Sequence, residues 1–126
     1  MNHNPAVLEC FPNPHPGRPF LIHHHVREFT SLCPKTGQPD FAEIHLHYVP
    51  STMCLELKSL KLYLQGFRNQ GIFYEDVTNV ILNDLAACCG PTWMRLETHW
   101  NVRGGIQSVI IAEHGTPPTQ TPPGVR

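Results

Sequence analysis

The sequence lacks both a long hydrophobic run and an excess of either charge. No apolar stretch reaches about 18 residues, the minimum for a membrane-spanning helix, and Met1–Pro5 has neither the basic nor the apolar region of a secretory signal. Nine Lys and Arg against ten Asp and Glu give a net charge of −1, which is too little to hold a nucleic acid or an anionic membrane. These absences predict a cytoplasmic protein with no direct nucleic-acid ligand and no membrane partner.

The cysteines lack the spacing of a metal site or of a disulfide framework. They are Cys10, Cys33, Cys54, Cys88 and Cys89. An odd number without a C-x-x-C pair, in a chain without a secretory signal, predicts free thiols. We interpret Cys54, Cys88 and Cys89 as packing residues. Cys10 is more ambiguous, because it falls in a Pro-rich stretch with no neighbouring base.

Proline is concentrated at the two ends of the chain. Residues 1–19 hold five of the thirteen prolines, and residues 115–126 hold four more. Proline has no backbone N–H and interrupts hydrogen-bonded ladders. We therefore predict an extended N-terminal arm over 1–19 without regular ladders, one folded domain over 20–114 and a flexible tail over 115–126.

Hydrophobic alternation predicts four strands, over 20–28, 41–49, 93–100 and 105–113. In the second strand the even-numbered residues from Ala42 to Tyr48 are apolar, whereas the odd-numbered positions carry Glu and His. One face of this strand is therefore expected to point toward the core.

Two helices are expected between the second and third strands. Apolar residues at helical spacing predict one over 59–69 with Ser59 as its N-cap, and a second that continues from Val77 to a stop at Gly90-Pro91. The order β-β-α-α-β-β predicts an α+β fold with a four-stranded antiparallel sheet and both helices on one face. Four strands cannot close a barrel alone, so the sheet edges favour a symmetric homo-oligomer.

The segment 28–40 carries the densest group of reactive side chains. Pro34 and Pro39 restrict its backbone, Lys35 is placed to lower the pKa of Cys33, and Asp40 is placed to exchange a proton. The alternative is that Cys33 is a small buried hydrophobe and Asp40 a turn former. The residues alone leave these two interpretations about equal.

Other candidate sites are weaker. His45 and His47 share a strand face, but no third ligand is evident, so a polar sheet face is favoured and no metal is predicted. Lys58 and Lys61 share a helix face that suits a phosphate, unless they are simply solvated. Arg103 in a turn is a possible phosphate donor.

A carboxylate near the second helix suggests recognition of a purine-like base. In Tyr74-Glu75-Asp76, a buried Glu75 would accept two hydrogen bonds from an amino-imine edge of such a base. The alternative is that these acidic residues only complement the helix dipole.

Together these residues resemble the NADPH-dependent 7-cyano-7-deazaguanine reductases of the short, single-domain type. The resemblance runs from about Leu8 to about Glu113. The segments that carry it are Phe29–Phe41 (FTSLCPKTGQPDF), Glu56–Tyr63 (ELKSLKLY), Phe67-Arg68-Asn69 and Glu75-Asp76.

The resemblance implies a fold, an assembly and a reaction. The fold is the tunnelling fold, whose barrel is completed by oligomerisation, usually as a decamer of two pentamers with active sites between subunits. The reaction is the NADPH-dependent reduction of a deazaguanine nitrile to a primary amine, on the route to the queuosine of transfer RNA.

The resemblance also implies roles for individual residues. Cys33 is the nucleophile that forms a thioimide, and Asp40 is the proton donor. Substrate-binding residues are Leu55, Glu56, Leu57, Tyr74 and Glu75, and cofactor-binding residues are Lys58, Lys61 and Arg103. The sequence departs from the common pattern at Tyr74, where many relatives have His, at Leu57, where Ser is common, and at Val102, where Pro is frequent. Tyr74 is therefore expected to stack or to donate a hydrogen bond, without a histidine's proton role.

Two other functions remain open from the sequence. One is a non-redox hydrolase or amidino-group transferase of the same fold, acting on a deazapurine or pterin-like base. The other is a noncatalytic ring that only binds a base and leaves Cys33 inert.

Overall fold

The computed structural model describes residues 2–118. Its elements are a 3-10 turn η1 (Pro5–Val7), β1 (Cys10–Pro12), β2 (Ile22–Leu32), β3 (Pro39–Val49), β4 (Met53–Leu55), α1 (Leu57–Gln65), α2 (Tyr74–Cys89), β5 (Trp93–Trp100) and β6 (Val109–Gly115). Among these residues, no helix has the length and apolar character needed to cross a membrane. The predicted flexible tail lies mostly in 119–126, outside the described residues.

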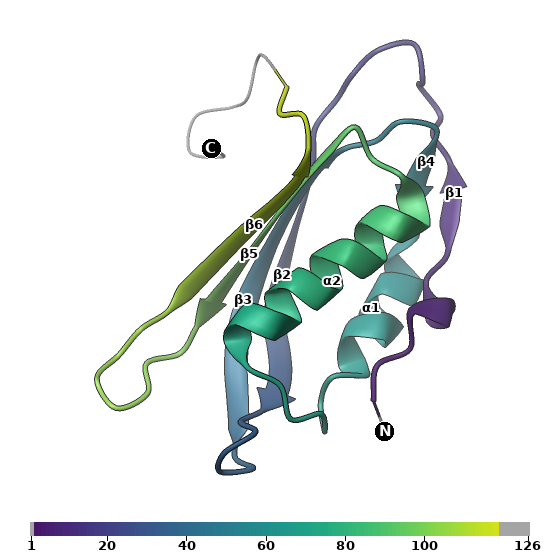
Figure 1. Ribbon diagram of the computed structural model, residues 1–126. Coiled ribbons are helices and arrows are strands. Elements are labelled where there is room, and N and C mark those ends of the chain that lie inside the picture. The colour runs from purple at the N-terminus through teal and green to yellow at the C-terminus, as the bar shows by residue number, and fades with distance from the viewer. Residues whose placement is uncertain (1, 119–126) are drawn as a thin grey trace.

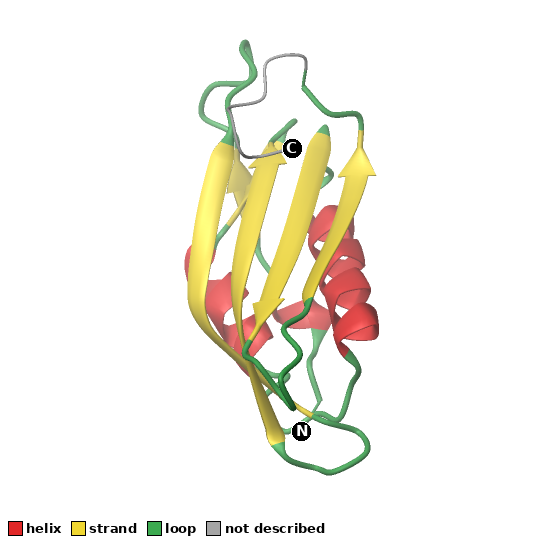
Figure 2. Cartoon of the chain, turned by 90° about the vertical axis from the view of Figure 1, so that its left-hand side faces the viewer, coloured by secondary structure: helices red, strands yellow, loops and turns green. Residues whose placement is uncertain are grey.

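The main sheet has four antiparallel strands in the order β2-β3-β5-β6. Both helices cover one of its faces, and no helix of residues 2–118 covers the opposite face (Figures 1 and 2). This arrangement confirms the predicted α+β architecture. The two edges of the sheet are β2 and β6, so neither edge has a partner strand within the described part of the chain.

The core lies between the helices and the sheet. On β3, the apolar residues predicted to face inward, Ala42, Ile44, Leu46 and Tyr48, are all at least 96% buried. They pack with residues of both helices and of β5 in one cluster. Burying each large apolar side chain contributes about 1.5–3 kcal/mol, so this layer fixes the helices on the sheet.

The first helix begins two residues earlier than predicted. Glu56, rather than Ser59, is its N-cap: the Glu56 carboxylate accepts hydrogen bonds from the backbone N–H groups of Lys58 (2.8 Å) and Ser59 (2.7 Å). The Ser59 hydroxyl instead accepts the N–H of Glu9 (2.9 Å). The helix ends at Gln65, short of the predicted end at 69, and Gly66 is its C-cap.

The second helix also begins earlier, at Tyr74 instead of Val77. Glu75 and Asp76 therefore lie in its first turn, where their negative charge complements the helix dipole. Its end is as predicted, because Gly90 adopts the left-handed conformation (φ 56°) that glycine reaches without steric cost.

Strand boundaries differ at both edges of the sheet. The first strand covers 22–32 instead of 20–28, so the loop before β3 is much shorter than predicted. The last strand starts at Val109 instead of 105, because Gly104 (φ 59°) and Gly105 (φ 78°) form a turn closed between Arg103 and Ile106.

The expectation that residues 1–19 form no ladder is wrong. Cys10–Pro12 pairs antiparallel with β4, a strand that the sequence analysis missed, and Cys10 lies opposite Leu55. The pairing tolerates Pro12 because β1 is an edge strand of a two-stranded sheet, where proline is accepted. Cys10 is thus part of a small second sheet and not of a free arm.

Candidate active site

A short loop, Cys33–Gln38, joins β2 to β3 and presents the predicted nucleophile. The backbone N–H of Cys33 donates to the carbonyl of Gln38 (2.8 Å), and that of Gly37 donates to the carbonyl of Cys33 (2.8 Å). Gly37 has φ 72°, which favours glycine there. These bonds close the loop on itself, so Cys33 is held in one position.

The same loop stabilises the Cys33 thiolate. Hydrogen bonds from the Thr36 hydroxyl and from the backbone N–H groups of Thr36 and Lys35 lower the pKa of Cys33, although the nearby Asp40 opposes this. The contribution of Lys35 thus comes from its backbone and not, as predicted, from its ammonium group. A thiolate is the nucleophilic form of cysteine, so the loop favours attack by Cys33.

Asp40 is buried, and one of its carboxylate oxygens is hydrogen-bonded twice. Its side chain is 6% exposed, and Oδ1 accepts hydrogen bonds from Arg103 Nη1 (2.7 Å) and from the Tyr74 hydroxyl (3.2 Å). The Arg103 guanidinium also donates to the carbonyl of Pro39 (3.0 Å) and to the side chain of Gln38 (3.2 Å). Arg103 therefore ties the turn before β6 to the loop that carries Cys33.

Tyr74, the first residue of α2, is fixed by two contacts. Its ring stacks on Trp100 with centroids 3.9 Å apart, and its hydroxyl donates to Asp40. Burial, followed by the charge of Asp40, raises the pKa of Tyr74. The tyrosine therefore remains a hydrogen-bond donor at neutral pH, in line with the expectation that it stacks or donates.

Five of the predicted residues line one cavity of about 180 Å³, which we call the Cys33 cavity. These five residues are Cys33, Asp40, Tyr74, Glu75 and Arg103. Its remaining walls are Pro34, Ile72 and Phe73, of which the sequence analysis missed the last two. The only signal for them was their position directly before Tyr74. The cavity therefore combines a nucleophile, a buried carboxylate, an exposed carboxylate and an apolar wall.

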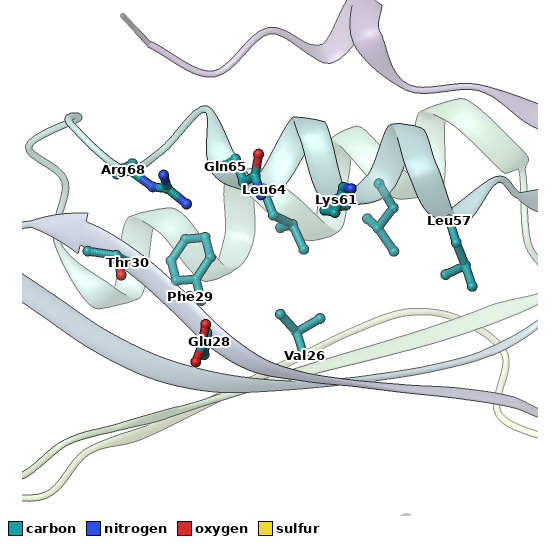
Figure 3. A pocket seen from close by; sticks show the side chains of 10 residues that line it. Val26, Glu28, Phe29, Thr30, Leu57, Lys61, Leu64, Gln65 and Arg68 are labelled. Carbon is teal, nitrogen blue, oxygen red and sulfur yellow. The ribbon is translucent and has the colours of Figure 1, made fainter.

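A second cavity of about 260 Å³, which we call the α1 cavity, lies between α1 and the edge strand β2 (Figure 3). Leu57, Lys61, Gln65 and Arg68 face it from the helix side, and Glu28 faces it from β2. Two of the predicted site residues, Leu57 and Lys61, belong to it, whereas Arg68 was missed as a site residue. Its walls carry two cations but no thiol.

The other predicted residues lie in neither cavity. Leu55 is buried in the core, Glu56 caps α1, and Lys58 is exposed at the start of that helix. The third predicted cofactor-binding residue, Arg103, lines the Cys33 cavity and is therefore separated from Lys58 and Lys61. The structure therefore divides the predicted substrate-binding and cofactor-binding residues between separate parts of the chain.

Four histidines of β2 and β3, on the sheet face away from the helices, form a stacked array: His23, His25, His45 and His47. His47 stacks on His23 (4.0 Å between centroids), and His45 stacks on His25 (4.2 Å). Within residues 2–118, no group of three or more His, Cys, Asp or Glu side chains is arranged to hold a metal ion.

Comparisons with known proteins agree on one family. A family model described as QueF-like protein matches residues 39–119. A protein of Thioalkalivibrio sulfidiphilus is 58% identical over 115 residues, which cover 91% of this chain and 89% of that protein. A protein of Methylobacillus flagellatus is 53% identical over 126 residues, 99% of this chain and 91% of that protein. Both are named NADPH-dependent 7-cyano-7-deazaguanine reductase.

A solved structure is similar to this chain in its fold. The chain is similar to the archaeosine synthase QueF-Like in the apo form, with a TM-score of 0.73 and 22% sequence identity, over 80% of this chain and 99% of that one. At this identity the likeness concerns the fold alone, and it confirms the expected tunnelling fold.

Proposed function

The chain belongs to the QueF-like family of NADPH-dependent 7-cyano-7-deazaguanine reductases, and from this premise we propose a mechanism that centres on Cys33. The reaction reduces the nitrile of 7-cyano-7-deazaguanine to the primary amine of 7-aminomethyl-7-deazaguanine, a step of queuosine biosynthesis. The observation that carries the mechanism is that Cys33, whose pKa is lowered, lines the same cavity as the buried Asp40.

The first step is addition of the Cys33 thiolate to the nitrile carbon. A C–S bond forms, one π bond of the nitrile breaks, and the nitrogen takes a proton, which gives a thioimide. Asp40 is suited to carry that proton from the thiol of Cys33 to the nitrogen, because Arg103 and Tyr74 hold its carboxylate at the cavity.

When bound, NADPH would supply the hydride for each of the two reductions that remain. The first hydride, with a proton, would convert the thioimide into a hemithioaminal, which would expel the Cys33 thiolate and leave an imine. The second hydride, with a further proton, would convert that imine into the amine. Ile72 and Phe73 give the cavity an apolar wall, which would help to keep out the water that hydrolyses an imine.

We propose that Glu75 recognises the base. It lies in the first turn of α2 and lines the Cys33 cavity. Its carboxylate would accept two N–H groups from the amino-imine edge of the deazaguanine. The neighbouring Tyr74 stacks on Trp100, so its hydroxyl group has a fixed position at the cavity.

The α1 cavity suits the phosphate groups of NADPH. Lys61 and Arg68 both face it, and guanidinium and ammonium groups bind phosphate. Because Glu28 lies on the opposite wall, we place the phosphate on the α1 side. Lys58 would add positive charge at the start of the helix, and Arg103 would contribute only after it leaves Asp40.

A complete site would require two copies of the chain. Within one subunit, the Cys33 cavity and the α1 cavity are separate, and the edge strands β2 and β6 have no partner in residues 2–118. Ile106, Val109 and Ile111 leave an apolar surface along β6 that is 45–69% exposed. We propose a homo-oligomer, a decamer of two pentamers, in which neighbouring chains join these parts.

The free thiols support a proposal for the cell compartment. The cysteines are free in the structure, and free thiols persist in reducing compartments. We therefore place the enzyme in the cytoplasm.

Turnover with a defined stoichiometry tests this function. Incubation with the nitrile and NADPH should oxidise two NADPH per nitrile and yield the primary amine. Consumption of the nitrile without NADPH would identify a hydrolase or transferase instead, and binding without turnover would identify a noncatalytic ring. Light scattering and activity, measured over one dilution series, should decline together if the site is shared between subunits.

A further inference from the structure

Four of the five cysteines gather where β1, β4 and the C-terminal end of α2 meet. Cys54, Cys88 and Cys89 all lie close enough to Cys10 for their charges to raise its pKa. Cys54 and Cys89 are buried, whereas Cys10 and Cys88 are partly exposed. Because no metal-holding group occurs within residues 2–118, these sulfurs are not arranged as a zinc site.

Cys10 and Cys88 form the closest pair in this group. Their Sγ atoms are 2.9 Å apart, and the thiol of Cys10 also lies 3.3 Å from the carbonyl oxygen of Cys88. A disulfide bond is about 2.0 Å long, so the two sulfurs need to approach by only about 0.9 Å. The residues are 78 positions apart and belong to different elements, which hold them together through the fold.

We infer that Cys10 and Cys88 are an oxidative modification site, at which a disulfide oxidant converts the two thiols into a reversible intramolecular disulfide. With oxidised glutathione, one protein thiolate displaces a glutathione thiolate and forms a mixed disulfide. The second protein sulfur then displaces the remaining glutathione. Two electrons pass from the protein sulfurs to the glutathione sulfurs, and the two released glutathione thiolates take up the two thiol protons.

The surroundings of Cys10 slow this exchange at neutral pH. Burial, then the hydrogen bond and charge of Cys88, raise the pKa of Cys10 to about 12. Cys10 therefore stays a thiol at neutral pH and must lose its proton before its sulfur can attack. Since exchange proceeds through the thiolate, the rate should increase with pH.

The disulfide would fix the N-terminal segment to α2. Cys10 lies in a strand of three residues that pairs with β4, and the preceding Glu9 is already hydrogen-bonded to Ser59. The disulfide would add a covalent link to these contacts. The new bond would close a long loop and restrict the unfolded chain. Cys88 and Tyr74 lie near opposite ends of α2, roughly 21 Å apart at 1.5 Å per residue, so the Cys33 cavity would stay out of reach.

Peptide mapping of the oxidised protein tests this site. The full chain is treated with oxidised glutathione, its remaining thiols are alkylated, and its peptides are analysed by mass spectrometry without reduction. We expect a linked pair of peptides containing Cys10 and Cys88, a Tm higher by roughly 5–15 °C, and the loss of both with dithiothreitol. The variant Cys33→Ser should keep the link and the shift, whereas Cys88→Ser and Cys10→Ser should lose both.

Other results would overturn the inference. A wild-type protein that links Cys33 to another cysteine, that joins separate chains, or that forms no Cys10–Cys88 link would contradict it. The wild-type map is decisive by itself, so the conclusion does not depend on the folding of a variant. A link without any rise in Tm would refute its stabilising role.

Discussion

The Cys33 cavity and the α1 cavity differ in what their walls can do. The first combines a thiol of lowered pKa with the buried Asp40 and the exposed Glu75. The second offers the cations Lys61 and Arg68 beside apolar side chains, and it has no nucleophile. One region therefore suits bond formation and proton transfer, whereas the other suits the holding of an anion.

The positions of these groups explain the difference. The reactive groups lie on a loop, a strand and a helix start that are tied together by Arg103 and Tyr74, so each is fixed. The cations lie on the solvent side of α1 and the loop after it, where Lys61 and Arg68 are exposed. Fixed geometry favours catalysis, and exposed long cations favour a charged ligand that arrives from solution.

Among the residues around Cys33, the largest effect is expected at Asp40. Asp40→Asn keeps the shape but cannot carry a proton, so turnover should decrease by about 10²- to 10⁴-fold while binding of the nitrile persists. Steady-state kinetics and calorimetry on the same preparation measure both. Glu43→Gln, an exposed change on the same strand, is the control. Equal turnover of the Asn variant and the parent would remove Asp40 from the mechanism.

A smaller effect is expected at Glu75. On a Cys33→Ala background, Glu75→Gln should weaken binding of the nitrile by about 5- to 100-fold, because one N–H donor of the base would lose its acceptor. Calorimetry measures this without turnover. Asp76→Asn changes a carboxylate in the same helical turn that does not line the cavity. If both variants bind equally, Glu75 does not recognise the base.

The α1 cavity should respond to the cofactor alone. Lys61→Ala and Arg68→Ala should each raise the KM for NADPH by about 10-fold, and neither should change the dissociation constant of the nitrile. Lys58→Ala, near the start of the same helix but outside the cavity, should raise this KM by less. A larger effect of Lys58→Ala would place the phosphate elsewhere on α1.

The smallest effect concerns the loop around Cys33. Thr36→Val removes the hydroxyl that is the main cause of the lowered pKa of Cys33. The pKa should therefore rise, so the pH profile of alkylation should move to higher pH and the rate at neutral pH should decrease. Thr36→Ser keeps the hydroxyl and should keep the parent profile. Identical profiles for the Val variant and the parent would contradict this explanation.

Local patterns in the sequence predicted much of the fold and part of the site. Alternation along β3 and the stop at Gly90 depend on neighbouring residues, and both were predicted correctly. The loop that carries Cys33 was identified because its prolines, thiol and carboxylate are adjacent in the sequence.

Features that depend on contacts between distant residues were not predictable in this way. The ion pair of Asp40 with Arg103 joins residues 63 positions apart, and β1 forms only because β4 lies beside it. The Glu56 cap was missed for a different reason. Ser59 is also a favoured capping residue, and only the three-dimensional position of Glu9 shows that its hydroxyl is used elsewhere.

The most direct test of the account is a search for the covalent adduct of Cys33 with the nitrile. Intact-protein mass spectrometry after mixing with 7-cyano-7-deazaguanine, without NADPH, should show the mass of the protein plus one nitrile, and peptide mapping should place it on Cys33. Addition of NADPH should remove the adduct and release the amine, and Cys33→Ala should form none. A protein that reduces the nitrile without any adduct, or a Cys33→Ala variant that still turns over, would contradict the account.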